Sequence, residues 1–269
     1  MGYYVAVEQD VKIFVEDVNP DGKQTLLFIH GWPADHRLFE YQFNVLPALG
    51  YRCIAIDLRG FGHSDKPWDG FSFDCLADDV RSVVDTLKLD RFILVGHSVG
   101  GAISIRYMGR HAGHGVSKLI LLAAAAPSFI QRPNFPYGLR KEEVDQLIEA
   151  TENNRPKMLH DLNDTFFFQN VGGPFADWFF QINLLAAGYS TSAVLVSLRE
   201  ETLFSDIAGI MVPTLILQGI HDEIVKPQLA MVLHESIPGS KLVWLDSSGH
   251  GLFWEQKDEV NEQIAHFIG

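Results

Sequence analysis

Short, continuous runs of apolar residues recur along the chain, separated by stretches in which apolar residues fall at helical spacing. A continuous apolar run of about four to eight residues predicts a strand that is covered on both faces of a parallel sheet. Two short strands joined by a turn are predicted before these runs, over 3–7 and 11–16. The runs predict strands over 25–29, 51–56, 92–95, 118–122, 213–219 and 241–245.

Amphipathic stretches alternate with these strands. In the stretch 73–87, Leu76, Val80 and Val83 fall on one face of a helix. Alternating strands and helices predict right-handed crossovers. The fold class is therefore α/β, with a mostly parallel central sheet and helices on both faces. The spacing predicts helices over 37–49, 73–87, 98–110, 228–236 and 253–268.

The alternation stops between residues 127 and 204, where the pattern is helical and no strand is evident. One helix is expected over 141–151, and two aromatic clusters follow at 166–168 and 178–180. We interpret 127–204 as an inserted helical cap. The core domain is then expected in two parts, 1–126 and 205–269.

Composition limits the partners and the compartment. The chain has 269 residues, 47% of them hydrophobic, which is enough for a sizeable core. Its 21 basic and 34 acidic residues give a formal net charge of −13, which argues against nucleic acid and anionic membranes as partners. No signal-peptide pattern and no apolar run of membrane-spanning length is visible, so we expect a cytoplasmic protein. Cys53 and Cys75 lack the spacing of a metal site or a redox pair and are expected to be free thiols.

The strongest chemical signal is at residues 96–100, which read G-x-S-x-G directly after the strand 92–95. This is the pattern of a nucleophile elbow, in which a sharp turn between strand and helix carries a serine clear of the sheet. Gly96 and Gly100 are required because side chains there would clash with neighbouring backbone. Ser98 would then lie at a helix N-terminus, where free N–H groups favour developing negative charge.

A serine hydroxyl needs a base to become a nucleophile, and a carboxylate commonly orients that base. In this architecture the expected chain order is Ser, acid, His, each in a loop after a strand. Asp222 follows the strand 213–219, and His250 follows the strand 241–245. We therefore predict a Ser98–Asp222–His250 triad. Glu223 is the alternative acid, one position away and with a longer side chain.

The oxyanion of an acyl-transfer intermediate needs two N–H donors. One is expected from Val99, the residue after the nucleophile, and the other from Trp32, in the loop after the strand 25–29. The remaining histidines are interpreted as structural: His30 and His97 as hydrogen-bonding groups beside the site, and His36 as a surface or packing residue. No set of His, Asp and Glu has convincing metal spacing, so neither a metal nor another cofactor is expected.

These motifs together resemble the α/β-hydrolase superfamily along nearly the whole chain. More narrowly, the chain resembles bacterial aryl esterases and cofactor-free (non-haem) haloperoxidases, also called perhydrolases. The superfamily resemblance is carried by residues 30–33, 57–65, 96–101, 219, 222 and 249–250. The narrower one is carried by residues 32–33, 41–42, 50–52, 59–62, 67–68 and 77–79.

The resemblance implies an α/β-hydrolase fold, the same triad, and oxyanion donors at Trp32 and Val99. It further implies that Trp32, Phe129, Phe166 and Ile224 contact the substrate. Pro33 goes with peracid-forming activity in that subgroup, although a proline can also simply stiffen the loop.

The chain departs from the subgroup at three positions beside the site. It has His97 and Val99 where Phe and Met are frequent, and Leu58 where Arg is frequent. The sequence of the cap also differs. The substrate preference of the subgroup is therefore not carried over to this chain.

We expect a hydrolase of small carboxylic esters that acts through an acyl-enzyme, with peroxide as a second acceptor besides water. A lactone or amide hydrolase with the same triad is the first alternative. A non-catalytic receptor for a small ligand on the same scaffold is the second, because fold alone does not settle function. The sequence does not predict the oligomeric state.

Overall fold

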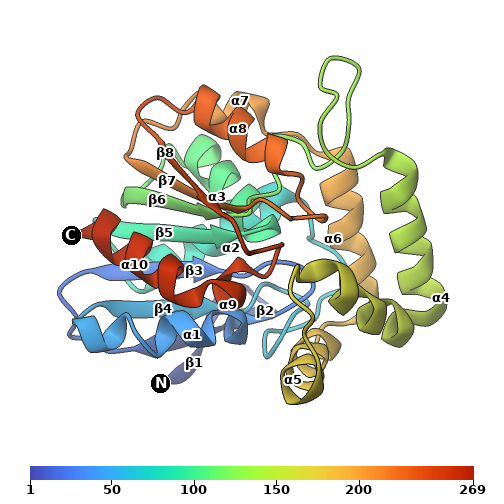
Figure 1. Ribbon diagram of the computed structural model, residues 1–269. Helices are drawn as coiled ribbons and strands as arrows, with labels where there is room; N and C mark the ends of the chain where they lie inside the picture. Colours follow the sequence, from blue (N-terminus) through green and yellow to red (C-terminus); the bar gives the residue numbers. More distant parts are fainter.

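The computed structural model describes residues 1–269, and its centre is one eight-stranded sheet with the strand order β1-β2-β4-β3-β5-β6-β7-β8 (Figure 1). β1 and β2 form antiparallel pairs, and the strands from β4 to β8 run parallel. The predicted strands are all present, with ends that agree to within about two residues. They are β1 (Gly2–Glu8), β2 (Val11–Val18), β3 (Thr25–Ile29), β4 (Arg52–Ile56), β5 (Phe92–His97), β6 (Val116–Leu122), β7 (Thr214–Gly219) and β8 (Lys241–Leu245).

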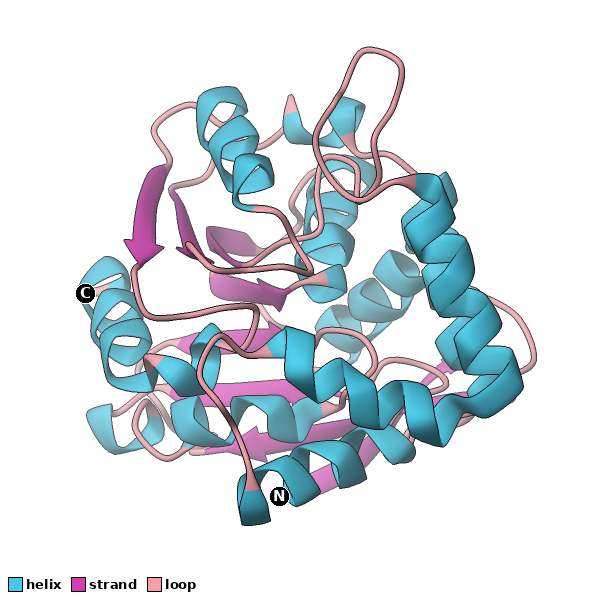
Figure 2. Cartoon of the chain, turned by 45° about the vertical axis from the view of Figure 1, so that its right-hand side comes forward, coloured by secondary structure: helices cyan, strands magenta, loops and turns pink.

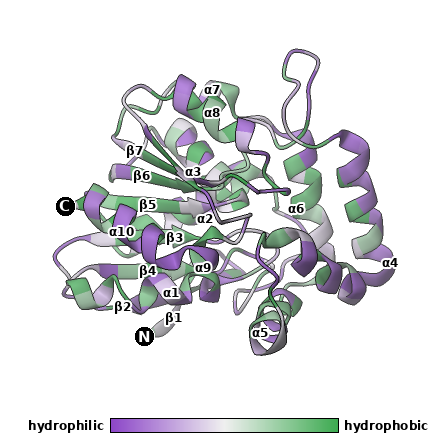
Figure 3. Cartoon of the chain, viewed as in Figure 1, coloured by the Kyte–Doolittle hydropathy of each residue, from purple (hydrophilic) through white to green (hydrophobic).

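Helices cover both faces of this sheet, as the alternating pattern predicts. α2 and α3 pack against each other on one face, and α1, α9 and α10 gather on the other (Figure 1). The central strands are hydrophobic along their length, whereas α4 carries many hydrophilic residues (Figure 3). The helices other than α4, α5 and α6 are α1 (Glu40–Phe43), α2 (Phe73–Thr86), α3 (Val99–Arg110), α7 (Phe204–Ile207), α8 (Pro227–Ser236), α9 (Leu252–Glu255) and α10 (Lys257–Ile268), with the 3₁₀ turns η1 (His36–Phe39) and η2 (Pro47–Leu49).

The segment between β6 and β7 is mainly helical and forms α4 (Lys141–Phe166), α5 (Gly173–Leu184) and α6 (Gly188–Glu200), which lie beyond one end of the sheet (Figures 1 and 2). α4 is bent at Asn154, whose backbone leaves the helical region. Pro156 explains the bend, because it has no N–H to give to the preceding turn and its ring clashes with that turn. Single β-bridges join Ile130 to Leu139 and Arg132 to Phe135, where no strand was predicted.

Two helix predictions were wrong in their continuity. The stretch 37–49 is not one helix but η1, α1 and η2, because Pro47 cannot donate the hydrogen bond that would continue the helix. The stretch 253–268 is divided at Gln256, whose side chain accepts a hydrogen bond from the Ser247 N–H (2.8 Å). This second break depends on a contact between segments, so local apolar spacing could not indicate it.

No single helix is both long and apolar enough to cross a membrane. α5 and α6 meet the length and composition requirement only as a pair, and an 88° bend separates them.

An ion pair in the core fixes the loop after β4 to α2. Nε and Nη2 of Arg59 each donate to one carboxylate oxygen of Asp79, at 2.6 Å. Nη2 also lies 2.5 Å from Oε1 of Glu8. Arg59 and Asp79 are both buried. Burial raises the pKa of Asp79, and the Arg59 guanidinium opposes that rise. Burying these two charges costs free energy, and removing either partner would leave the other charge buried without its main counter-charge.

Replacing Asp79 with alanine is expected to lower the free energy of unfolding by about 3–5 kcal/mol, because it leaves the Arg59 guanidinium buried with only the exposed Glu8 as partner. Asp78→Ala is the matched control, because Asp78 pairs with Arg110 at the surface and such pairs contribute about 1 kcal/mol or less. Urea unfolding of both variants measures the difference. Equal losses would contradict this account of the pair.

Candidate active site

Ser98 lies between β5 and α3, in the turn that the glycine pattern predicts. Its φ of 55° and ψ of −119° are strained for a residue with a side chain, as functional sites tolerate. A Cβ on Gly96 would lie 2.4 Å from the Gly100 carbonyl oxygen, and one on Gly100 would lie 2.2 Å from that of Ile29. The two glycines therefore let the elbow close on itself and let the end of β3 approach it.

The loop after β3 lies directly against the serine. A Cβ on Gly31 would lie 2.4 Å from Nδ1 of His97 and 3.0 Å from Cβ of Ser98. The N–H groups of Trp32 and Val99, the predicted oxyanion donors, donate to no backbone or side-chain acceptor in the structure. The Trp32 indole is buried and donates to the Thr191 carbonyl of α6 (3.0 Å), so it joins the core to the cap.

Asp222 and His250 are brought together by the adjacent strands β7 and β8. Oδ2 of Asp222 lies 2.8 Å from Nδ1 of His250, and both side chains are buried. Oδ2 also accepts from the Gln218 amide (3.0 Å), and Oδ1 accepts from the N–H groups of Ile224 (2.9 Å) and Val225 (2.8 Å). Glu223, the alternative acid, is exposed and has no such bond.

These bonds define the proton positions on His250. A carboxylate only accepts, so the proton of the neutral ring lies on Nδ1 and Nε2 carries the lone pair. Nε2 is buried and has no hydrogen-bond partner, and no hydrogen bond joins it to Ser98. Catalytic hydrogen bonds are often long before substrate binds, so this geometry remains compatible with a base and its nucleophile.

His97 links the elbow to the loop of His250. Its Nε2–H donates to the His250 carbonyl oxygen (3.1 Å), and the two rings lie 4.7 Å apart. Burial holds the pKa of His97 well below its usual range, so the ring is neutral. The structural role predicted for His97 agrees with this contact. His30 also has one, because its Nε2 accepts the Leu58 N–H (3.0 Å).

The substrate-contact residues that the resemblance implied lie in different surroundings. The ring of Phe166 meets that of His250 edge-on at 4.8 Å, and Phe166 is buried. Phe129 is buried in the segment after β6. Ile224 is half-buried beside Asp222, to which its N–H donates.

Sequence reasoning missed three groups that shape this region. Gln218 orients Asp222, and Glu255 binds the loop before His250 through the Gly249 N–H (2.8 Å). His36, interpreted as a surface or packing residue, instead binds Asp57 through Nδ1 (2.7 Å). None of these residues belongs to a local motif, so only the folded contacts identify them.

Two groups of side chains have donor atoms close enough together for a metal ion, Glu8–Cys75–Asp79 and Asp35–His36–Asp57. Arg59 pairs with the first group and Arg37 with the second. Burial raises the pKa of the Cys75 thiol to about 11, which keeps it protonated and a poor ligand at neutral pH. Both groups are thus already engaged in ion pairs.

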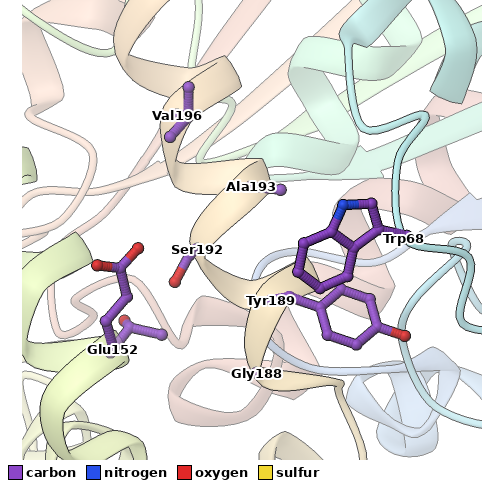
Figure 4. Close-up of a pocket in the computed structure, with 8 residues that line it drawn as sticks. Trp68, Glu152, Gly188, Tyr189, Ser192, Ala193 and Val196 are labelled. Atoms are coloured by element: carbon purple, nitrogen blue, oxygen red, sulfur yellow. The ribbon is translucent and has the colours of Figure 1, made fainter.

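A pocket of about 560 Å³ lies between α4 and α6 and contains none of the predicted catalytic residues (Figure 4). Trp68 and Tyr189 form one side of it, with their rings 5.1 Å apart, and Glu152 of α4 lies on the other side (Figure 4). A second pocket, of about 420 Å³, borders Asp222 and is lined by Phe168 and His221.

Comparisons with known proteins agree with this architecture. A family model described as alpha/beta hydrolase fold matches residues 24–257. The chain is 48% identical to the AB hydrolase superfamily protein YisY of Bacillus subtilis, over 99% of both chains. It superposes on an esterase from Exiguobacterium antarcticum (TM-score 0.97, 39% identity, 100% and 99% coverage). It also superposes on a bromoperoxidase from Bacillus anthracis (TM-score 0.95, 28% identity, 100% and 99% coverage).

The close approach of β3 to the elbow predicts a steric effect. Gly100→Ala is expected to destabilise the protein by about 2–3 kcal/mol, because its Cβ would press on two backbone carbonyl oxygens, those of Ile29 and His30. Gly172→Ala is the control: a Cβ there meets nothing within 4 Å, so the change should stay within about 0.5 kcal/mol. Thermal and urea unfolding measure both, and an undisturbed Gly100→Ala protein would contradict the packing.

Proposed function

Because the chain belongs to the α/β-hydrolase family, we propose that it is a serine hydrolase that cleaves a small carboxylic ester through an acyl-enzyme. The observation that carries the proposal is the buried pair of Asp222 and His250. The pair leaves a lone pair on Nε2 of His250. The loop that carries His250 is hydrogen-bonded to the nucleophile elbow through His97. The similarity to an esterase over the full chain supports the same reaction class.

In this mechanism Nε2 of His250 takes the proton of Ser98 as the serine oxygen attacks the ester carbonyl carbon. The negative charge that develops on the carbonyl oxygen is met by the free N–H groups of Trp32 and Val99. Asp222 stabilises the imidazolium, which then gives its proton to the leaving alcohol. Water attacks the acyl-enzyme with His250 again as base, which releases the acid and restores the serine.

The acyl group is proposed to be short and apolar. Phe166 is buried with its ring against that of His250, and Phe129 is buried in the segment after β6. The Trp32 side chain is held by the bond of its indole to Thr191, and the backbone of Ile224 is held by the bond of its N–H to Asp222. We therefore assign these four residues to the acyl side of the site.

A second acceptor, hydrogen peroxide, is proposed beside water. The similarity to a bromoperoxidase and the presence of Pro33 directly after Trp32 support this activity. Peroxide would attack the same acyl-enzyme and release a peracid in place of the acid. No residue beyond those already named is needed.

Ser98 provides the direct test. A fluorophosphonate probe is expected to label the wild-type protein at Ser98 and to leave Ser98→Ala unlabelled, as mass spectrometry would show. The same protein should turn over short-chain aryl esters at about 1–10³ per second, faster than lactones or anilides of similar size. A receptor would bind these compounds without turnover, and an unlabelled wild-type protein would contradict the proposal.

The acid is tested by a matched pair of neighbours. Asp222→Asn should lower kcat by about 10³–10⁴-fold, because an amide donor opposite Nδ1 favours the wrong tautomer of His250. Glu223→Gln should leave kcat within about twofold, because that side chain is exposed. Steady-state kinetics on one ester decide between them. A large loss in Glu223→Gln with little loss in Asp222→Asn would exchange the two assignments.

A further inference from the structure

The Glu255 carboxylate is bound entirely by backbone N–H groups. Oε1 accepts from Phe168 (2.7 Å) and Gln169 (2.8 Å), and Oε2 accepts from Gly249 (2.8 Å). The side chain is half-buried, and no cationic side chain pairs with it. Burial raises the pKa of Glu255, while the three backbone donors oppose the rise.

These donors belong to segments that are far apart in the sequence. Phe168 and Gln169 follow the long cap helix α4, and Gly249 immediately precedes His250. A further contact joins the same segments, because the Gly251 N–H donates to the Phe166 carbonyl (3.0 Å). The ring of Phe168 also stacks on His221, in the loop after β7, at 3.6 Å. We call residues 166–169, 247–251 and Glu255 the cap–base junction.

The junction fits a carboxylate and no other side chain of its size. Three N–H groups converge on two oxygens, and hydrogen bonds to a charged acceptor are about twice as strong as neutral ones. Glutamine would place an NH₂ group where one oxygen now accepts, so a donor would face a donor. The neighbouring Gly249 is equally constrained, because a Cβ there would lie 2.8 Å from the Phe168 nitrogen.

We propose that Glu255 is a positioning residue for the general base: it holds His250 in register through Gly249 and holds the end of α4 against the same loop. This rests on the proposed function, in which His250 takes the proton of Ser98. His250 is then fixed through its side chain by Asp222, through its carbonyl by His97 and through the preceding N–H by Glu255. Alignment of the base thereby depends on the docked position of the cap.

A positioning role separates kcat from KM. Glu255 is not assigned to contact the ester, so its loss should slow proton transfer while binding is retained. An error of about 1 Å in the placement of a catalytic group costs on the order of 10²-fold in rate. A role confined to the stability of α9 would instead lower the unfolding midpoint and leave kcat unchanged well below it.

The experiment compares Glu255→Gln with Glu262→Gln in the full chain. Glu262 is exposed on α10 and makes no side-chain hydrogen bond. At a temperature well below both unfolding midpoints, Glu255→Gln is expected to lower kcat about 10–100-fold with KM within about twofold. The rate of fluorophosphonate labelling at Ser98 should fall by the same factor, and Glu262→Gln should match the wild type.

Amide hydrogen exchange gives a readout that does not depend on activity. Glu255→Gln should speed exchange at Phe168 and Gly249, with the first half of α4 unchanged. Glu255→Asp keeps the charge but is one methylene too short to reach both segments, so intermediate rates are expected, and this variant serves if the glutamine protein does not fold. Wild-type kcat and labelling rate in both Glu255 variants, or a rise in KM alone, would overturn the inference. An unlabelled wild-type protein would instead contradict the proposed function, and exchange would still report on the junction.

Discussion

The buried carboxylate of Asp222 places the strictest requirement on the candidate site. An ionised carboxylate away from water is stable only when its oxygens are hydrogen-bonded. Asp222 meets that requirement with four donors, from Gln218, Ile224, Val225 and His250. Three of them lie within four residues of Asp222 in sequence, so the end of β7 and its loop hold the carboxylate largely by themselves. His250 is then the one distant donor, and its ring is oriented as a consequence.

Sheet topology brings the rest of the site to this carboxylate. β5, β6, β7 and β8 are adjacent and parallel, so the loops after them emerge at one edge. A Cβ on Gly219 would lie 2.2 Å from the Gly249 carbonyl oxygen, which shows how closely the loops after β7 and β8 approach. β3 lies on the other side of β5 and supplies the loop with Trp32. Each member of the predicted triad, and each predicted oxyanion donor, thus follows a strand whose apolar run is visible in the sequence.

The sequence predicted what local physics determines. The elbow requires glycine where backbone meets backbone, and the strands require continuous apolar runs, so the fold class and the position of Ser98 could be predicted. The predicted continuity of helix 37–49 was wrong because apolar spacing does not register the missing N–H of Pro47, and two of the apolar positions, Val45 and Leu49, are exposed. Glu255 and Gln218 could not be predicted, because their roles arise from contacts between segments or from the path of one loop and have no spacing of their own.

The cap is tied to both halves of the proposed chemistry. The Thr191 carbonyl of α6 accepts a hydrogen bond from the Trp32 indole, and Trp32 belongs to the loop beside Ser98. The end of α4 is bonded to the loop of His250 through Glu255 and through the Phe166 carbonyl. A movement of the whole cap would therefore break contacts on the nucleophile side and on the base side together. Under the proposed function, Trp32 and Phe166 are the side chains through which the position of the cap would affect the fit of the ester.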